Sequence, residues 1–187
     1  MSRIVGIAGR QGNCQEHKNI LESLGIRNKI IIEGKDIKGI THLILPGGES
    51  TTQEMLWRKT KLWKEIKAFD NPTLGTCAGA IHLSKKYKNY DVYCKRNAFG
   101  NQKESFYKEM NFGYGKKPTK KLKAMFIRAP RIFCKENNGH FFEEWANFEF
   151  TNGKTEVAVA KIGKDWLSTC HPEAVGDDTL HKRFLEI

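Results

Sequence analysis

The first half of the chain alternates short apolar runs with segments whose apolar residues recur at helical spacing. Four apolar runs bounded by turn residues are typical of buried strands: Arg3–Ala8, Lys29–Ile32, Ile40–Leu45 and the run after Asn71-Pro72 that ends at Cys77. Helical spacing predicts four helices: Gln15–Leu24, a segment reaching Trp57, Leu62–Phe69, and a run directly after Cys77. Strands that alternate with helices favour a doubly wound, mostly parallel sheet with helices on both faces.

After Tyr90 the strand-like runs are separated by irregular segments in place of helices. Four runs predict strands: Val92–Cys94, Leu122–Ile127, Thr155–Lys161 and Asp165–Cys170. Leu180–Ile187 predicts a short terminal helix. Three segments are interpreted as irregular: Arg96–Phe106, the lysine cluster Lys116–Lys123, and the acidic and aromatic stretch between Arg131 and Thr155. The expected fold class is therefore α/β, a three-layer, doubly wound, mostly parallel sheet with antiparallel additions.

Length and composition narrow the class of protein further. The 187 residues, 39% of them hydrophobic, contain no linker-like stretch, so we expect a single domain over residues 1–187. No apolar run approaches the roughly 20 residues of a membrane span, and no targeting segment is evident, which favours a cytoplasmic protein. The five cysteines form no Cys-X-X-Cys pair, so we expect reduced thiols, no metal site and no cofactor.

The formal net charge of +11 makes nucleic-acid binding an alternative to consider. The lysines are spread over the whole chain and accompany no nucleic-acid-binding motif. We therefore interpret them as a solvated surface, with docking to an acidic protein as the second possibility, and expect neither a nucleic-acid nor a membrane partner.

Candidate chemistry centres on Cys77. The segment Gly75-Thr76-Cys77-Ala78-Gly79 lies between a predicted strand and a predicted helix. This is the cysteine form of a nucleophile elbow, in which flanking glycines allow a turn sharp enough to lift the nucleophile above the sheet. A helix N-terminus there favours the thiolate, and its N–H groups can hold an oxyanion. A buried core cysteine is the alternative.

Two further segments fall at the carboxyl ends of predicted strands. Pro46-Gly47-Gly48-Glu49-Ser50-Thr51-Thr52 is a glycine-rich turn that can direct backbone N–H groups into a crevice. His171-Pro172-Glu173 supplies a histidine as base and acid, and a carboxylate to orient it. With Cys77, these residues fit acyl transfer from a small amide or ester.

These three segments resemble the class I glutamine amidotransferases. Two more narrow the resemblance to the glutaminase subunits of pyridoxal 5′-phosphate synthase: the run from Arg96 to Phe106, which contains Asn97-Ala98-Phe99-Gly100 and Gln102, and Phe126-Ile127-Arg128-Ala129-Pro130. The resemblance extends from Val5 to Glu173. It implies hydrolysis of glutamine to glutamate and ammonia, with the ammonia passing through a tunnel to a separate (βα)₈-barrel synthase subunit that builds the cofactor.

The resemblance also implies roles for individual residues. Cys77 would be the nucleophile, His171 the general base and acid, and Glu173 the orienting carboxylate. The N–H groups of Gly48 and Ala78 would form the oxyanion hole. The glutamine-binding residues would be Gly47, Gly48, Glu49, Ser50, Arg96, Ile127 and Arg128. Arg96 suits either the α-carboxylate of glutamine or an acidic residue that shapes the pocket.

Asn101, Tyr107 and Arg10 depart from the family pattern, and Cys170 is a second thiol beside His171. We expect Cys170 to pack in the core. Three alternatives to a glutaminase stay open: an inert regulatory or binding protein on the same scaffold, another cysteine hydrolase of similar topology, and nucleic-acid binding through the lysines.

Overall fold

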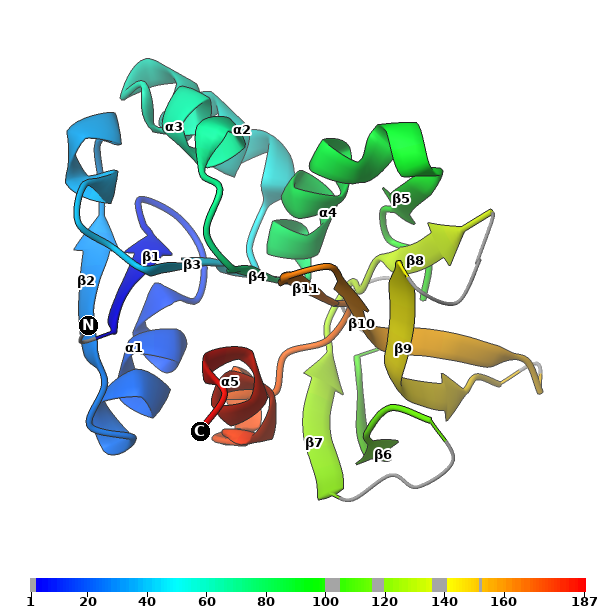
Figure 1. Cartoon of the computed structure of the whole chain (residues 1–187). Coiled ribbons are helices and arrows are strands. Elements are labelled where there is room, and N and C mark those ends of the chain that lie inside the picture. The colour runs from blue at the N-terminus through cyan, green and yellow to red at the C-terminus, as the bar shows by residue number, and fades with distance from the viewer. Residues whose placement is uncertain (1–2, 100–104, 116–119, 136–140, 152) are drawn as a thin grey trace.

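The computed structural model describes residues 3–99, 105–115, 120–135, 141–151 and 153–187 (Figure 1). One nine-stranded sheet runs through it in the order β2-β1-β3-β4-β11-β10-β9-β6-β7, and a two-stranded sheet joins β5 to β8. The strands are β1 Ile4–Ala8, β2 Arg27–Ile31, β3 His42–Leu45, β4 Thr73–Thr76, β5 Val92–Lys95, β6 Phe106–Phe112, β7 Lys120–Phe126, β8 Arg131–Cys134, β9 Phe142–Glu149, β10 Thr155–Ile162 and β11 Asp165–Ser168.

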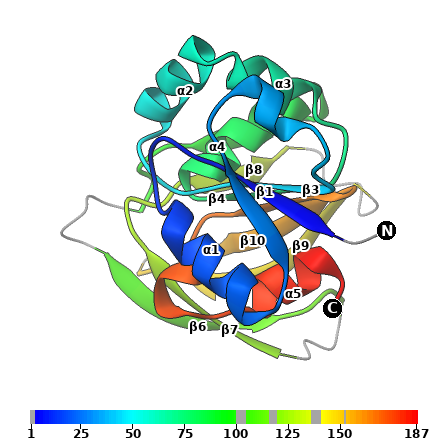
Figure 2. The same cartoon turned by 90° about the vertical axis from the view of Figure 1, so that its left-hand side faces the viewer.

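Helices cover both faces of the parallel strands (Figures 1 and 2). They are α1 Cys14–Ser23, α2 Ser50–Lys59, α3 Leu62–Ala68, α4 Ala78–Ser84 and α5 Thr179–Leu185, with 3₁₀ turns η1 Gly34–Ile37, η2 Lys85–Tyr90 and η4 Glu173–Val175. The sheet has a hydrophobic core on each face, and successive residues of a strand point into different cores. Ile44 of β3 packs in the cluster that includes α1 and α5, whereas Leu43 and Leu45 pack in the cluster that includes α2 and α3.

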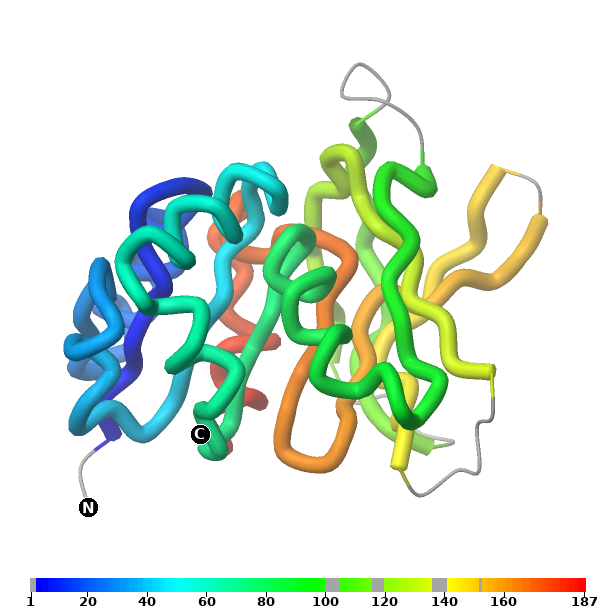
Figure 3. Tube along the Cα trace, turned by 90° about the horizontal axis from the view of Figure 1, so that it is seen from above, coloured from blue at the N-terminus to red at the C-terminus, as the bar shows by residue number. Residues whose placement is uncertain are grey.

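The expected fold class is confirmed, since β2, β1, β3, β4 and β11 pair in parallel and β10, β9, β6 and β7 extend the sheet antiparallel. Figure 3 shows the first strands and helices at one end of the molecule and β8, β9 and β10 toward the other. Among the described residues, no helix is long and apolar enough to cross a membrane.

Two segment predictions were wrong. The stretch between Arg131 and Thr155 is not irregular, because it contains β8 and β9, and β9 forms a long antiparallel pair with β10. The loop predicted over Lys116–Lys123 is already strand from Lys120 onward, where β7 pairs with β6. Residues 116–119 lie outside the described part of the chain.

Candidate active site

Cys77 lies in the sharp turn between β4 and α4. Its backbone has φ 49° and ψ −106°, an unusual conformation for a residue other than glycine. The Cys77 N–H donates to the Ser168 carbonyl at 2.8 Å, which ties the turn to β11. A Cβ at Gly79 would lie 1.8 Å from the Leu45 carbonyl oxygen, so α4 packs against β3 at a distance that only glycine allows. The strand, turn and helix predicted around Cys77 are therefore all present.

His171 reaches the same edge of the sheet from the segment after β11. Its backbone pairs with Met125 of β7, with the His171 N–H 2.8 Å from the Met125 carbonyl oxygen. Its Nδ1 lies 2.9 Å from Oε1 of Glu173, the first residue of η4. Because β4 and β11 are parallel neighbours, their carboxyl ends bring Cys77 and His171 together.

The electrostatics of His171 favour an ion pair with the thiol. Burial alone would lower the pKa of His171, but the side chains of Cys77 and Glu173, which interact with its imidazole, raise this pKa to about 10. At neutral pH the ring is therefore an imidazolium that can stabilise a Cys77 thiolate. Burial alone would raise the pKa of Glu173, but His17 and the His171 imidazolium hold it well below its usual range.

A cavity of about 400 Å³ lies at this edge, and the predicted site residues other than Glu173 line it. The triad residue Glu173 does not reach the cavity wall and lies behind His171. The lining residues that the sequence predicted are Gly47, Gly48, Glu49, Ser50, Cys77, Ala78, Arg96, Ile127, Arg128 and His171. Five loops that follow different strands thus converge on one volume large enough for a small amino acid.

The Gly47-Gly48 turn follows β3 and lies directly against His171. A Cβ at Gly47 would lie 2.2 Å from Cε1 of His171, so this close approach requires glycine. The next N–H in the turn, that of Glu49, donates to Oε1 of Gln11 at 2.9 Å. Ala78 is the first residue of α4, where backbone N–H groups have no acceptor within the helix. Both proposed oxyanion donors, Gly48 and Ala78, therefore line the cavity beside the thiol.

Arg96 pairs with an acidic residue of the pocket. Its Nη2 lies 2.9 Å from Oε1 of Glu49, and its Nη1 donates to Oγ1 of Thr51 at 3.0 Å. Of the two roles that the sequence left open, the structure matches the one in which the guanidinium shapes the pocket through a carboxylate. Elsewhere in the lining, the Cys77 thiol lies 3.7 Å from the carbonyl oxygen of Ile127.

The departures from the family pattern lie away from the triad where they are described. Arg10 is exposed, with φ 80°, and its Nε donates to the Ile32 carbonyl at 3.3 Å. Tyr107 is an exposed side chain of β6. Asn101 and Gln102 lie outside the described residues. Cys170 is fully buried among core residues, so its predicted packing role is confirmed.

Three polar residues at the site were not predicted from the sequence. The Asn13 amide donates to Oε1 of Glu173. The Thr76 hydroxyl donates to the same oxygen at 3.3 Å, and Nε2 of His17 lies 3.5 Å from it. Thr76 stands inside the elbow motif and Asn13 in the predicted first turn, so their positions at strand ends were the available signal. His17 gave none beyond its place on a helix.

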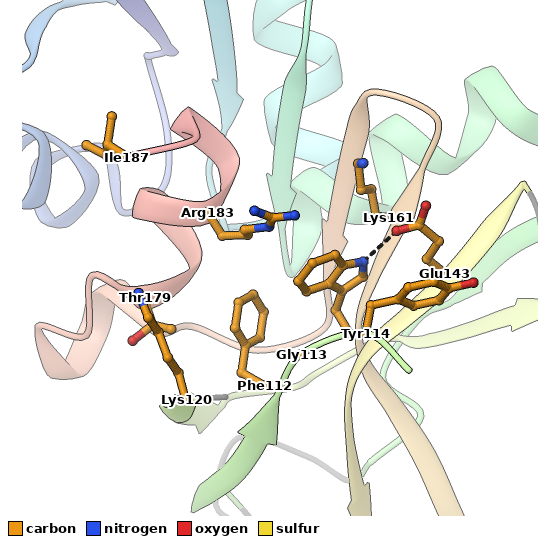
Figure 4. A pocket seen from close by; sticks show the side chains of 10 residues that line it. Phe112, Gly113, Tyr114, Lys120, Glu143, Lys161, Thr179, Arg183 and Ile187 are labelled. Atoms are coloured by element: carbon orange, nitrogen blue, oxygen red, sulfur yellow. Dashed lines mark hydrogen bonds between the residues drawn. The ribbon is translucent and has the colours of Figure 1, made fainter. Parts of the chain in front are cut away.

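A second cavity, of about 580 Å³, lies between β9, β10 and α5. Figure 4 shows aromatic side chains, Phe112 and Tyr114 among them, together with Lys120, Lys161 and Arg183. Its described lining contains neither cysteine nor histidine. The smaller cavity is therefore the candidate active site, because of the two cavities it is the one whose lining contains Cys77 and His171.

Comparison with known proteins identifies similar glutamine amidotransferases over nearly the whole chain. The model of the SNO glutamine amidotransferase family matches residues 7–187. The pyridoxal 5′-phosphate synthase subunit PdxT of Francisella tularensis subsp. tularensis is 33% identical over 190 residues, which cover 99% of both chains. PdxT of Francisella tularensis subsp. novicida is equally similar.

Two solved structures agree with these relatives. A crystal structure of a glutamine amidotransferase superposes with a TM-score of 0.79 at 34% identity, covering 97% of each chain. A glutamine amidotransferase of Thermotoga maritima, at 16% identity and a TM-score of 0.60, shares the fold over 99% of this chain and 84% of its own. With the family match and full-length relatives above 30% identity, this chain belongs to the SNO glutamine amidotransferase family.

Proposed function

We propose that this chain is the glutaminase subunit of a pyridoxal 5′-phosphate synthase and hydrolyses glutamine to glutamate and ammonia. The observation that carries the proposal is the cavity in which Cys77, His171 and the Gly47-Gly48 turn meet. Full-length similarity to PdxT supports the choice of the synthase over other amidotransferase systems. We place the enzyme in the cytoplasm, where its thiols would stay reduced.

In the proposed reaction, the Cys77 thiolate attacks the carboxamide carbon of the glutamine side chain. The N–H groups of Gly48 and Ala78 hold the oxyanion of the tetrahedral intermediate. His171 gives its proton to the leaving nitrogen, so that ammonia departs and a thioester remains. His171 then takes a proton from water, which attacks the thioester and releases glutamate and the Cys77 thiolate. Glu173 keeps the imidazole oriented throughout.

The walls of the cavity would bind the rest of glutamine. We assign this role to Gly47, Glu49, Ser50, Ile127 and Arg128, with Arg96 positioning Glu49 through their ion pair. Because the Cys77–His171–Glu173 array is assembled and its imidazolium faces the thiol, the geometry favours an active enzyme over an inert protein on the same scaffold.

The partner is the second part of the proposal. A (βα)₈-barrel synthase subunit would receive the ammonia, and free hydrolysis would waste glutamine. We therefore expect slow glutamate release by the isolated chain and a clear increase in kcat when the barrel subunit from the same source is added. Glutamate release should be measured with and without that subunit. Equal turnover in isolation would contradict the coupling, and no turnover in either case would contradict the glutaminase assignment.

The raised pKa of His171 makes a prediction about pH. An imidazole with a pKa of about 10 in the folded chain, above the ordinary value of about 6.5, stays protonated at neutral pH. It loses its proton, and with it the charge that pairs with Glu173, as pH rises through about 10. We therefore expect kcat/KM for glutamine to fall on the alkaline side near pH 10. In Glu173→Gln the fall should begin at lower pH, because the charge that raises the pKa of His171 is gone. A wild-type kcat/KM that already falls near pH 7 would contradict the raised pKa of His171 and its pairing with Glu173.

A further inference from the structure

Two fully buried histidines stand behind the triad and outside the cavity lining. His17 is on α1 and His181 is on α5, and neither exposes any surface. Nδ1 of His17 lies 2.8 Å from Nε2 of His181. Nε2 of His17 lies 3.0 Å from the Thr76 hydroxyl. Since neither imidazole reaches the glutamine cavity, any effect on the reaction must pass through Thr76 or Glu173.

His181, His17, Thr76 and Glu173 form a chain of hydrogen bonds, here called the donor chain. The number of protons and lone pairs on each group fixes which group donates in each bond. A hydroxyl has one proton and two lone pairs. The Thr76 hydroxyl gives its proton to Oε1 of Glu173 and accepts the Gly47 N–H at 3.1 Å. Its second lone pair therefore faces Nε2 of His17, which must carry a proton. This nitrogen also lies 3.5 Å from the Glu173 carboxylate. A proton on Nε2 is attracted to the carboxylate, whereas a lone pair on Nε2 would be repelled by it.

The same reasoning extends to His181. Burial lowers the pKa of His17 and lowers the pKa of His181 to about 3, so both rings are neutral at pH 7. With its proton on Nε2, neutral His17 presents a lone pair at Nδ1, and Nε2 of His181 must donate to it. Nδ1 of His181 then carries only a lone pair, in accord with its having no partner among the described residues. Protons thus point from His181 to His17 to Thr76 to Glu173.

The donor chain from His181 to Glu173 connects two parts of the candidate active site. At one end it directs donors onto Glu173, which orients His171. Through Thr76 it also holds the N–H of Gly47, whose α-carbon packs against the His171 ring. Other titratable groups near the chain are Glu16 on α1, Cys77 after β4 and Cys170 before His171. Of these, Cys77 contacts the Ile127 carbonyl, Cys170 contacts Ser168, and Glu16 lines the glutamine cavity.

We propose that His17 and His181 are positioning residues for glutamine hydrolysis, a donor chain that keeps Thr76 turned toward Glu173 and thereby aligns both His171 and the Gly47 turn. This inference rests on the proposed function and deepens it. Helix α5, which contributes no residue to the cavity lining, would in this way control the geometry of His171.

Two substitutions at His181 separate the donor from the bulk of the ring. His181→Leu fills similar space without an N–H, whereas the amide of His181→Gln can place an N–H where Nε2 stands. Hydrogen bonds in networks that end on a charged group justify an expected fall in kcat of about tenfold for His181→Leu, with KM for glutamine little changed. The alkaline fall of kcat/KM should also move to lower pH, because Glu173 is then no longer held in line with Nδ1 of His171. His181→Gln should restore much of kcat and the wild-type pH profile.

His42→Leu is the matched control for packing of the same helix. His42 lies edge-on against Phe184 of α5 with ring centroids 5.3 Å apart, but does not touch the donor chain. It should lower stability in urea without moving the pH profile. A normal kcat in His181→Leu would overturn the proposal. So would an equal loss in the Leu and Gln variants with an unmoved pH profile, since that result marks a structural role alone.

A third measurement does not depend on glutamine turnover. The rate at which Cys77 is alkylated, followed by mass spectrometry across pH, reports the His171–Cys77 pair in a chain that has no partner and no substrate. His181→Leu should shift this profile and His181→Gln should not. ¹⁵N spectra should show His17 and His181 neutral at pH 7 with their protons on Nε2, and protons on Nδ1 would overturn the chain. If the wild type hydrolyses no glutamine, the proposed function fails while these two readouts still test the donor chain.

Discussion

Replacing Cys77 with alanine is expected to lower glutamine hydrolysis by at least about 10⁴-fold, the scale found when a nucleophile is removed from a triad that acts as a unit. His171 and Glu173 stay in place in this variant, but no thioester can form. Cys77→Ser should be nearly as inactive, because a hydroxyl is far less acidic than a thiol beside an imidazolium. Glutamate release in the presence of the barrel subunit is the measurement.

The fold should survive the loss of Cys77, since its thiol lines the cavity, where it contacts the Ile127 carbonyl and the His171 imidazole. Urea unfolding and circular dichroism should match the wild type. Cys170→Ala is the matched control: this thiol is also buried near His171, but it packs in the core, so the variant should lose some stability and keep most of its activity. Full activity in Cys77→Ala would disprove the assigned nucleophile.

The sequence was sufficient for the parallel half of the fold because its signals are local. Ile4–Ala8 and the Leu43-Ile44-Leu45 part of β3 are continuous apolar runs of the kind that a sheet buried on both faces requires. β9 was missed for the opposite reason. It buries Phe142, Ala146 and Phe148 but exposes Glu144 and Asn147 between them, and its stability comes from pairing with β10 across a chain reversal. Such pairing is not visible in a single segment.

The residues of the candidate site also fall into two groups, those with a local sequence signal and those without one. The elbow at Cys77 and the His171-Pro172-Glu173 turn have recognisable spacing, and the structure brings them together as expected. Asn13 and His17 had no such spacing to Glu173, since about 160 positions separate them from it along the chain. Their roles depend on α1 packing against the segment that follows β11. Only the three-dimensional fold places those groups around the carboxylate.

Gly79→Ala is expected to lower the free energy of unfolding by about 3 kcal/mol, at the upper end of what overpacking costs in a buried site. The added Cβ would lie 1.8 Å from the Leu45 carbonyl oxygen and 2.6 Å from its carbon. Both atoms belong to the backbone of β3, so no side-chain rotation can relieve the overlap. Either α4 moves away from the sheet or β3 shifts, and either change alters the turn that holds Cys77.

Gly39→Ala separates this overlap from the general cost of replacing a glycine. Gly39 has φ 81° and no atom within 4 Å of an added Cβ, so its substitution should cost about 1 kcal/mol through backbone strain alone. Urea unfolding of both variants gives the difference. Because the elbow depends on the contact between α4 and β3, Gly79→Ala should also lose glutaminase activity under conditions where it is still folded, and Gly39→Ala should not. Equal stability of the two variants would show that α4 does not approach β3 as closely as the elbow at Cys77 requires.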